Sequence, residues 1–335
     1  MFFRYVSAFF AFGLILGASS IWSSDPWQDL SQEKVKEILN FSAIAFDRYR
    51  KPANFKALKE EGQWKGIKEF SGTTGYYIPC TLGFMAHRKP LLASSPAEIM
   101  IAFRGIEMNR YELPDLLQIH GSFLRDIFDT WRGNSANASD LLNIKGTIPS
   151  ASLSFLSSVK KDLVEKLDES LEELHDARDL RITLTGATFG GTLAALAAPL
   201  IQKHLKEKGK KNVSIRTMTF GAANFGDDAF KTEYNKSFPL LDVRIPDPAL
   251  SGISNISSSL TKTQSLGTTI TLNSIASTAS ASSMLGTYWS NFKLYFCPPP
   301  LKPLDFNQPT FRLDVVCVED FCTKDKEIYE AIKMQ

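Results

Sequence analysis

Two long segments of the chain repeat apolar residues at the spacing of an amphipathic helix. After residue 30 the apolar positions are Val35, Ile38, Leu39, Ala43 and Phe46, and Asp29 or Ser31 can act as N-cap. Between Ser152 and His175 charged residues separate the apolar ones, which are Leu156, Val159, Leu163, Leu167, Leu171 and Leu174. We therefore predict a helix in each segment, with one face turned toward a core.

Short apolar runs between polar stretches predict strands. These runs cover residues 74–85, 98–103, 181–185, 213–220 and 240–245. The first reads as a strand or hairpin in which Pro79 favours an edge position. The second is almost continuously apolar, as in a buried parallel strand. Because strands and helices alternate, the chain predicts an α/β fold, with a mostly parallel central sheet and helices on both faces.

Other segments lack a clear period. Residues 50–70 are charged and aromatic, residues 132–150 are polar and loop-like, and residues 203–211 are basic and loop-bound. Residues 251–290 are dense in Ser and Thr with almost no charge, so they form a flexible insert, a mobile lid or weak helices.

The N-terminus has the order of a secretory signal peptide. A basic start at Arg4 precedes an apolar stretch over 5–16 and small residues over 17–20. The apolar stretch is short for a membrane span, which favours a cleaved signal at 1–20 over an uncleaved anchor. We expect the mature chain to begin near residue 20 or 25, with one α/β domain over 25–305 and a C-terminal extension over 306–335.

Composition supports a single large domain and excludes some partners. The chain has 335 residues, of which 44% are hydrophobic and 22% charged, which is enough to bury a full core. Its net charge of +2 predicts no nucleic-acid partner. Export would make the four cysteines candidates for disulfide bonds. Cys317 and Cys322 are close enough in sequence to close a turn, and Cys80 and Cys297 would then pair by default. The sequence alone leaves three connectivities open. No metal or cofactor is predicted.

A catalytic motif stands at the strand–turn–helix junction after residue 185. Gly186-Ala187-Thr188-Phe189-Gly190 has the glycine register of the Gly-x-Ser-x-Gly nucleophile elbow, with threonine in place of serine. Three further motifs accompany it in order: 100–105, ending in Phe-Arg-Gly; 119–123, around His120; and 219–227, reading Thr-Phe-Gly and ending in Gly-Asp. Together these motifs resemble the class 3 (fungal-type) lipases and imply an α/β-hydrolase fold.

The resemblance implies ester hydrolysis by a Ser-His-Asp triad beside an oxyanion hole. Carried over by motif, the nucleophile position is Thr188, the oxyanion positions are Ile106 and Phe189, and the acid is Asp247. The family's base lies after its acid, but His87, His120, His175 and His204 all precede Asp247. Only His120 can be named as a substitute base.

We interpret these departures together. A threonine hydroxyl is unreactive without an adjacent base, so a noncatalytic role is favoured for Thr188. Asp247 reads equally well as a loop or helix-cap residue, and His175 and His204 are expected to be solvated. The sequence thus predicts a secreted pseudo-lipase that binds a lipid or acyl ester, or a protein partner. Peripheral contact with a membrane is compatible with this prediction. The alternatives are an esterase that uses Thr188 as nucleophile and a purely structural secreted protein.

Overall fold

The computed structural model describes residues 27, 30–47, 58, 63–73, 79–90, 95–105, 135–187, 189–222, 225–244, 266–271 and 329–330. Its helices and strands follow in the order α2 (Gln32–Asp47), β1 (Lys65–Thr73), β2 (Pro79–Arg88), β3 (Ala97–Phe103), β4 (Ser135–Asn137), α6 (Ser139–Leu142), β5 (Thr147–Pro149), α7 (Ser150–Glu173), β6 (Leu180–Ala187), α8 (Phe189–Glu207), β7 (Val213–Phe220), α9 (Asp228–Ser237), β8 (Leu240–Arg244) and β9 (Thr268–Thr271).

One large sheet organises these elements. Its described strands lie in the order β1-β2-β3-β6-β7-β8-β9, and β4 pairs only with β5. The pairs from β3 to β9 are parallel, whereas β1–β2 and β2–β3 are antiparallel. This mostly parallel sheet confirms the predicted fold class, because parallel neighbours require crossover helices on the sheet faces.

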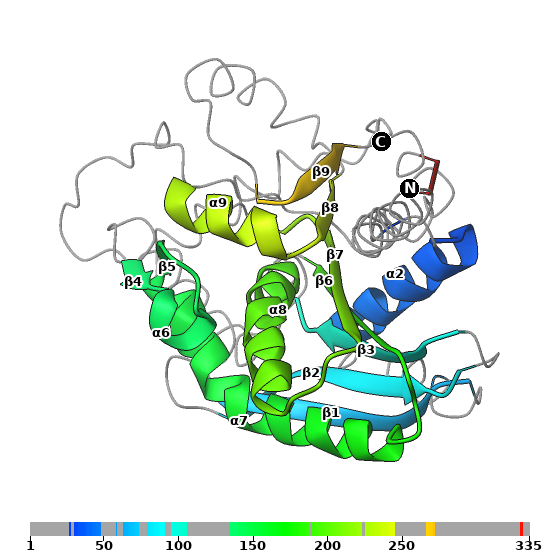
Figure 1. Ribbon diagram of the computed structural model, residues 1–335. Coiled ribbons are helices and arrows are strands. Elements are labelled where there is room, and N and C mark those ends of the chain that lie inside the picture. The colour runs from blue at the N-terminus through cyan, green and yellow to red at the C-terminus, as the bar shows by residue number, and fades with distance from the viewer. Residues whose placement is uncertain are drawn as a thin grey trace, which may run out of the picture.

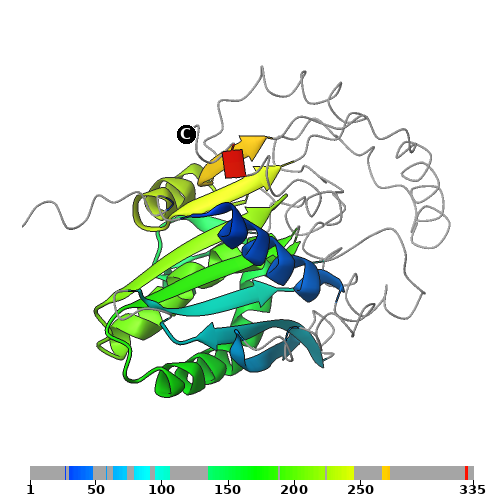
Figure 2. The same cartoon turned by 90° about the vertical axis from the view of Figure 1, so that its right-hand side faces the viewer.

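Helices cover both faces of the sheet (Figures 1 and 2). Helices α7, α8 and α9 lie on one face, where Tyr234 of α9 donates a hydrogen bond to the Ala195 carbonyl of α8. Helix α2 crosses the other face, and its apolar side joins Met100, Met218 and other strand residues in a second core. The Ser31 hydroxyl accepts a hydrogen bond from the Lys34 N–H at 3.1 Å, so Ser31 acts as the N-cap of α2.

Several sequence expectations need correction. Strand β2 has neighbours on both sides, so Pro79 does not mark an edge; it is the first residue of β2, where a missing N–H is tolerated. Strand β1 lies largely in a segment without periodicity. A strand pair and a short helix occupy much of 132–150, α8 continues through Glu207, and β9 lies within the Ser/Thr-rich segment. Strands β1 and β9 are regular because each pairs with a neighbouring strand of the large sheet, which local pattern does not reveal.

The edge strand β1 is covered by α7. The Asp162 carboxylate accepts the Ser71 N–H at 2.6 Å, and the Ser158 hydroxyl accepts the Thr73 N–H at 3.1 Å. Two backbone donors that an outermost strand would leave open are therefore occupied, which opposes edge-to-edge association.

Candidate functional site

The elbow predicted from the glycine register has the expected position in the fold. Strand β6 is central and parallel to both neighbours, it ends at Ala187, and α8 begins at Phe189. Thr188 itself lies outside the described residues. The predicted strand and the predicted start of the helix are both confirmed.

Close packing accounts for the two glycines that flank the elbow. A Cβ atom on Gly186 would lie 2.5 Å from the backbone carbonyl carbon and oxygen of Gly190. A Cβ atom on Gly190 would lie 2.5 Å from the Phe103 carbonyl oxygen, at the end of β3. Real Cβ atoms do not approach backbone this closely, so the ends of β6 and β3 can meet the first turn of α8 only if both positions are glycine.

An aromatic contact lies directly behind the elbow. Phe189, predicted as an oxyanion position, is buried and packs edge-on against Phe155 of α7, with ring centroids 5.2 Å apart. The first backbone N–H groups of any helix lack partners within the helix, so α8 begins with donors that could face a ligand. The other predicted site residues, Ile106, His120 and Asp247, and the cysteines Cys317 and Cys322, lie outside the described residues.

The three described histidines lie at the opposite end of the sheet from the elbow. His87 pairs with Ile99 near the start of β3, and His175 lies in the turn that leads into β6. His204 is in the last turn of α8, fifteen residues beyond Phe189, which corresponds to about 22 Å along a helix. None of these three lies near the end of β6 at Ala187 or the start of α8 at Phe189.

The contacts and exposure of these three histidines indicate structural roles. His175 is exposed, as expected. His204 was expected to be solvated, but only 14% of its side chain is exposed and Nε2 lies 2.8 Å from the Asp168 carboxylate of α7. His87 is buried, and this burial lowers the pKa of its imidazole, although the Glu173 carboxylate works in the other direction.

A buried ion pair missed by the sequence analysis lies beside the elbow, at the ends of β7 and β8. The Asp242 carboxylate, in an otherwise apolar stretch of β8, accepts hydrogen bonds from the Thr219 hydroxyl at 2.7 Å and the Ala222 N–H at 3.0 Å. Arg244 donates to Asp242 at 2.6 Å. Complete burial raises the pKa of the Asp242 carboxyl, and the Arg244 guanidinium opposes that rise.

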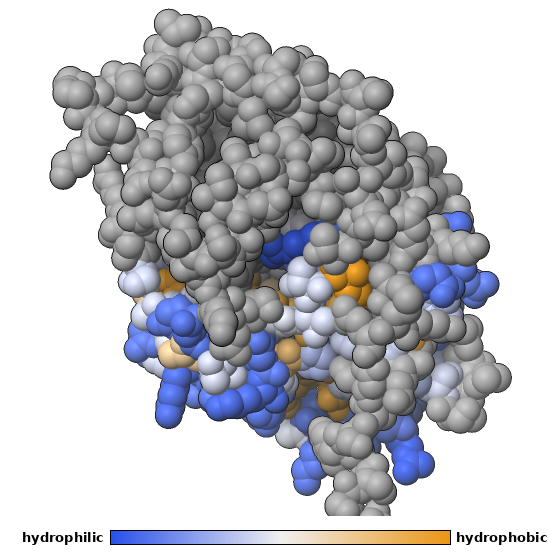
Figure 3. All heavy atoms as spheres, turned by 90° about the horizontal axis from the view of Figure 1, so that it is seen from above, coloured by the Kyte–Doolittle hydropathy of each residue, from blue (hydrophilic) through white to orange (hydrophobic). Residues whose placement is uncertain are grey.

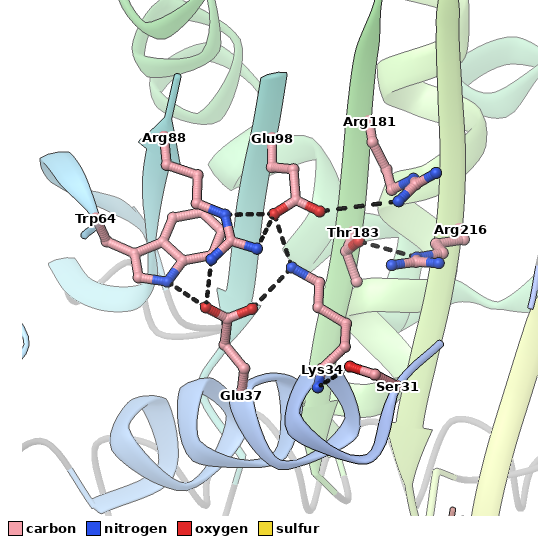
Figure 4. A network of polar contacts seen from close by, with 9 residues as sticks. All are labelled: Ser31, Lys34, Glu37, Trp64, Arg88, Glu98, Arg181, Thr183 and Arg216. Carbon is pink, nitrogen blue, oxygen red and sulfur yellow. Dashed lines mark hydrogen bonds and ion pairs between the residues drawn. The ribbon is translucent and has the colours of Figure 1, made fainter. Parts of the chain in front are cut away.

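A second charged cluster lies between α2 and the starts of the parallel strands (Figure 4). Lys34 donates at 2.8 Å to Glu37 and to Glu98, and Arg88 forms ion pairs with the same two carboxylates. Trp64 donates to Glu37 at 2.7 Å. Burial works to raise the pKa of Glu98, but Lys34 and Arg88 outweigh it and hold that pKa below 4.5. The cluster joins α2 to β2 and β3 and lies away from the elbow.

The described surface adds no further candidate centre. No group of three His, Cys, Asp or Glu residues among the described positions is arranged to hold a metal ion. No helix within the described part of the chain has the length and apolarity needed to cross a membrane. In the view from above, the described surface residues form small apolar areas that lie among hydrophilic areas (Figure 3).

The sequence match identifies the class of protein. Residues 100–246 match the family described as lipase (class 3), a segment that contains the end of β3, the elbow and the turn after β7. Over this segment the chain therefore matches the class 3 lipase family, and its mostly parallel sheet is that of an α/β-hydrolase fold, as its motifs predict. A search of curated proteins found no match.

Solved structures of fungal lipases are among the similar folds. A fungal lipase–inhibitor complex has 15% identity and a TM-score of 0.44, and the alignment covers 68% of this chain and 77% of that one. The lipase of Rhizopus microsporus var. chinensis has 18% identity and a TM-score of 0.39, with 66% and 72% covered. The Rhizomucor miehei lipase–propeptide complex has 16% identity and a TM-score of 0.42, with 68% and 66% covered.

Proposed function

We propose that this protein is an exported, catalytically inactive class 3 lipase-type protein that binds an acyl-chain lipid beside its elbow. The observation that carries the proposal is the position of the histidines. A triad hydrolase needs a base within hydrogen-bond reach of its nucleophile, and His87, His175 and His204 lie at the wrong end of the sheet.

Two substitutions support the same conclusion. Thr188 puts a β-branched residue at a turn that normally holds serine in a strained conformation. Ile106 replaces a residue whose side chain donates to the oxyanion in the family, and loss of one such donor costs about a hundredfold or more in rate. The elbow scaffold is nevertheless kept, with its glycines close-packed. A retained scaffold without its chemistry favours binding over hydrolysis.

We favour a lipid over a protein partner because of what surrounds the elbow. Phe155 and Phe189 form a buried aromatic contact at the start of α8, which makes the surroundings of the elbow apolar. The N-terminus of α8 adds donors suited to an ester or carboxylate oxygen. An acyl chain ending in such a group would match both features.

The second candidate is an esterase in which Thr188 is the nucleophile and His120 the base. It follows from the family motif around His120, the one histidine outside the described residues. Hydrolysis of short-chain and long-chain glycerol esters by wild type, Thr188→Ala, Thr188→Ser and His120→Ala separates the two candidates.

We expect no turnover above background for any of these proteins. Thr188→Ser should not restore activity, because parts of a triad act as a unit and the base would still be missing. Wild-type turnover that Thr188→Ala and His120→Ala both abolish would establish the esterase instead. Lipid binding is tested separately by titration with cis-parinaric acid, a fluorescent fatty acid; the absence of saturable binding would refute it.

A further inference from the structure

We propose that Asp242 and Arg244 are positioning residues for the ligand site, which they support by holding the turn after β7 against the first turn of α8. This inference rests on the proposed function. It assigns a role to a buried ion pair that takes no part in the triad chemistry of the family motifs.

The pair holds both polar backbone groups of one residue. The Ala222 N–H donates to the Asp242 carboxylate at 3.0 Å, and the Ala222 carbonyl accepts from Arg244 Nη2 at 2.8 Å. The remaining Asp242 contacts are to the Thr219 hydroxyl and to Arg244 Nε. Ala222 therefore cannot rotate or move outward unless charge-assisted hydrogen bonds break.

The geometry of the turn shows why such support is needed. Gly221 has a φ of 65°, in the left-handed region, and its N–H donates to the Val243 carbonyl at 2.8 Å. The chain turns sharply there while still buried in the core. Backbone groups of a buried turn need partners from elsewhere in the fold, and the Asp242–Arg244 pair supplies two of them.

The held turn touches the elbow helix. A Cβ atom on Gly191 would lie 2.9 Å from the Ala222 Cβ and 3.1 Å from the Thr219 Cβ, so the first turn of α8 packs directly on two residues that Asp242 holds. Arg244 is the last described residue of β8 and precedes Asp247 by three positions. The pair therefore holds two residues that pack against the first turn of α8, and it lies just before the segment that carries the predicted acid.

Stability alone does not account for a charged pair at this position. Replacing a buried ion pair by apolar residues is often neutral or stabilising, because desolvation offsets much of the attraction. An apolar pair, however, would leave the N–H and carbonyl of Ala222 without these partners. The advantage of Asp242 and Arg244 is thus a defined turn conformation next to the ligand site.

The test combines two readouts on the full-length protein. Hydrogen exchange of the Ala222 amide reports whether the turn is held, and the Kd of cis-parinaric acid reports the site. The variants are Asp242→Ala, Arg244→Gln and the neutral pair Asp242→Asn/Arg244→Gln. Asp168→Ala is the matched control, since it removes a carboxylate paired with His204 at the far end of α8.

We expect the Ala222 amide to exchange at least tenfold faster in Asp242→Ala and Arg244→Gln, and the Kd to rise at least tenfold. The neutral pair should recover most of the amide protection and of the affinity, because it removes the unpaired buried carboxylate that Arg244→Gln leaves, and an amide oxygen at 242 can still accept from Thr219 and Ala222. Asp168→Ala should change neither. Arg244, whose side chain is 18% exposed, offers a variant that still folds if Asp242→Ala does not.

The outcomes separate this inference from the proposed function. Unchanged exchange in Arg244→Gln would show that the pair does not hold the turn. Faster exchange with an unchanged Kd would refute the positioning role. If wild type fails to bind the probe, the proposed function and the positioning role are wrong, and the exchange rates still decide whether the pair holds the turn.

Discussion

Around the elbow, the two glycines matter because they have no side chain and let neighbouring backbone segments pack closely. Gly186 and Gly190 lie where a Cβ atom would overlap the backbone of a neighbouring element. Both have room only for hydrogen, so the glycine register visible in the sequence reports a contact between segments that are far apart along the chain. Thr188 stands between these glycines in the sequence, at a position where the scaffold is kept and the nucleophile is replaced.

We predict that Gly190→Ala lowers the free energy of unfolding by about 3 kcal/mol, at the upper end for overpacking, because the clash is with backbone that cannot rotate away. Gly209→Ala is the control: Gly209 has a φ of +69° but nothing within 4 Å of its Cβ position, so its cost should be about 1–2 kcal/mol of backbone strain. Urea unfolding measures both. Equal losses in the two variants would contradict the packing argument.

At the scale of elements, α2 is fastened to the sheet in two ways. Its apolar side packs into the second core, and Lys34 and Glu37 enter the charged cluster with Arg88 and Glu98. Each charge in the cluster has an opposite partner within hydrogen-bond distance. Removing one carboxylate would leave Lys34 and Arg88 partly buried beside each other with less compensation.

We predict that Glu98→Gln destabilises the protein by about 3 kcal/mol at pH 7, as loss of one partner in a buried ion pair does. The pKa of Glu98 is depressed in the folded state, so its contribution is complete above the unfolded-state value near 4.5 and is lost as pH falls through the folded pKa. The difference between wild type and variant should therefore shrink below pH 4.5. Urea unfolding followed by tryptophan fluorescence checks this, and a difference that stays constant down to pH 3 would contradict it.

For the whole molecule, export and disulfide formation are the untested expectations. The basic start, apolar stretch and small residues of the first twenty positions predict cleavage near residue 20 or 25. Cys317 and Cys322 should then be bonded. Intact-mass measurement of the protein released from secreting cells, before and after reduction, checks both expectations. A mass that includes residue 1, or four free thiols, would show the respective expectation to be wrong.

The sequence by itself determined the features that depend on neighbouring residues. Strand β7 follows from periodicity, the start of α8 follows from the glycine register of the elbow, and α7 begins within two residues of its predicted start. The elbow register and the lipase family follow from motifs whose glycines serve close packing. Such signals are local, because side-chain period and steric space are properties of a short stretch of chain.

The tertiary structure alone decided which distant residues meet. Strand β1 is regular because β2 and α7 pair with it, and His204 is covered because Asp168 of another helix reaches it. In the sequence, Asp242 is an unexplained charge in an apolar strand. In the fold, Thr219, Ala222 and Arg244 all donate hydrogen bonds to it. The positions of His87, His175 and His204 at the far end from the elbow likewise follow only from the strand order and the helix lengths. These facts depend on contacts between segments separated by many residues, for which no short stretch of sequence carries the information.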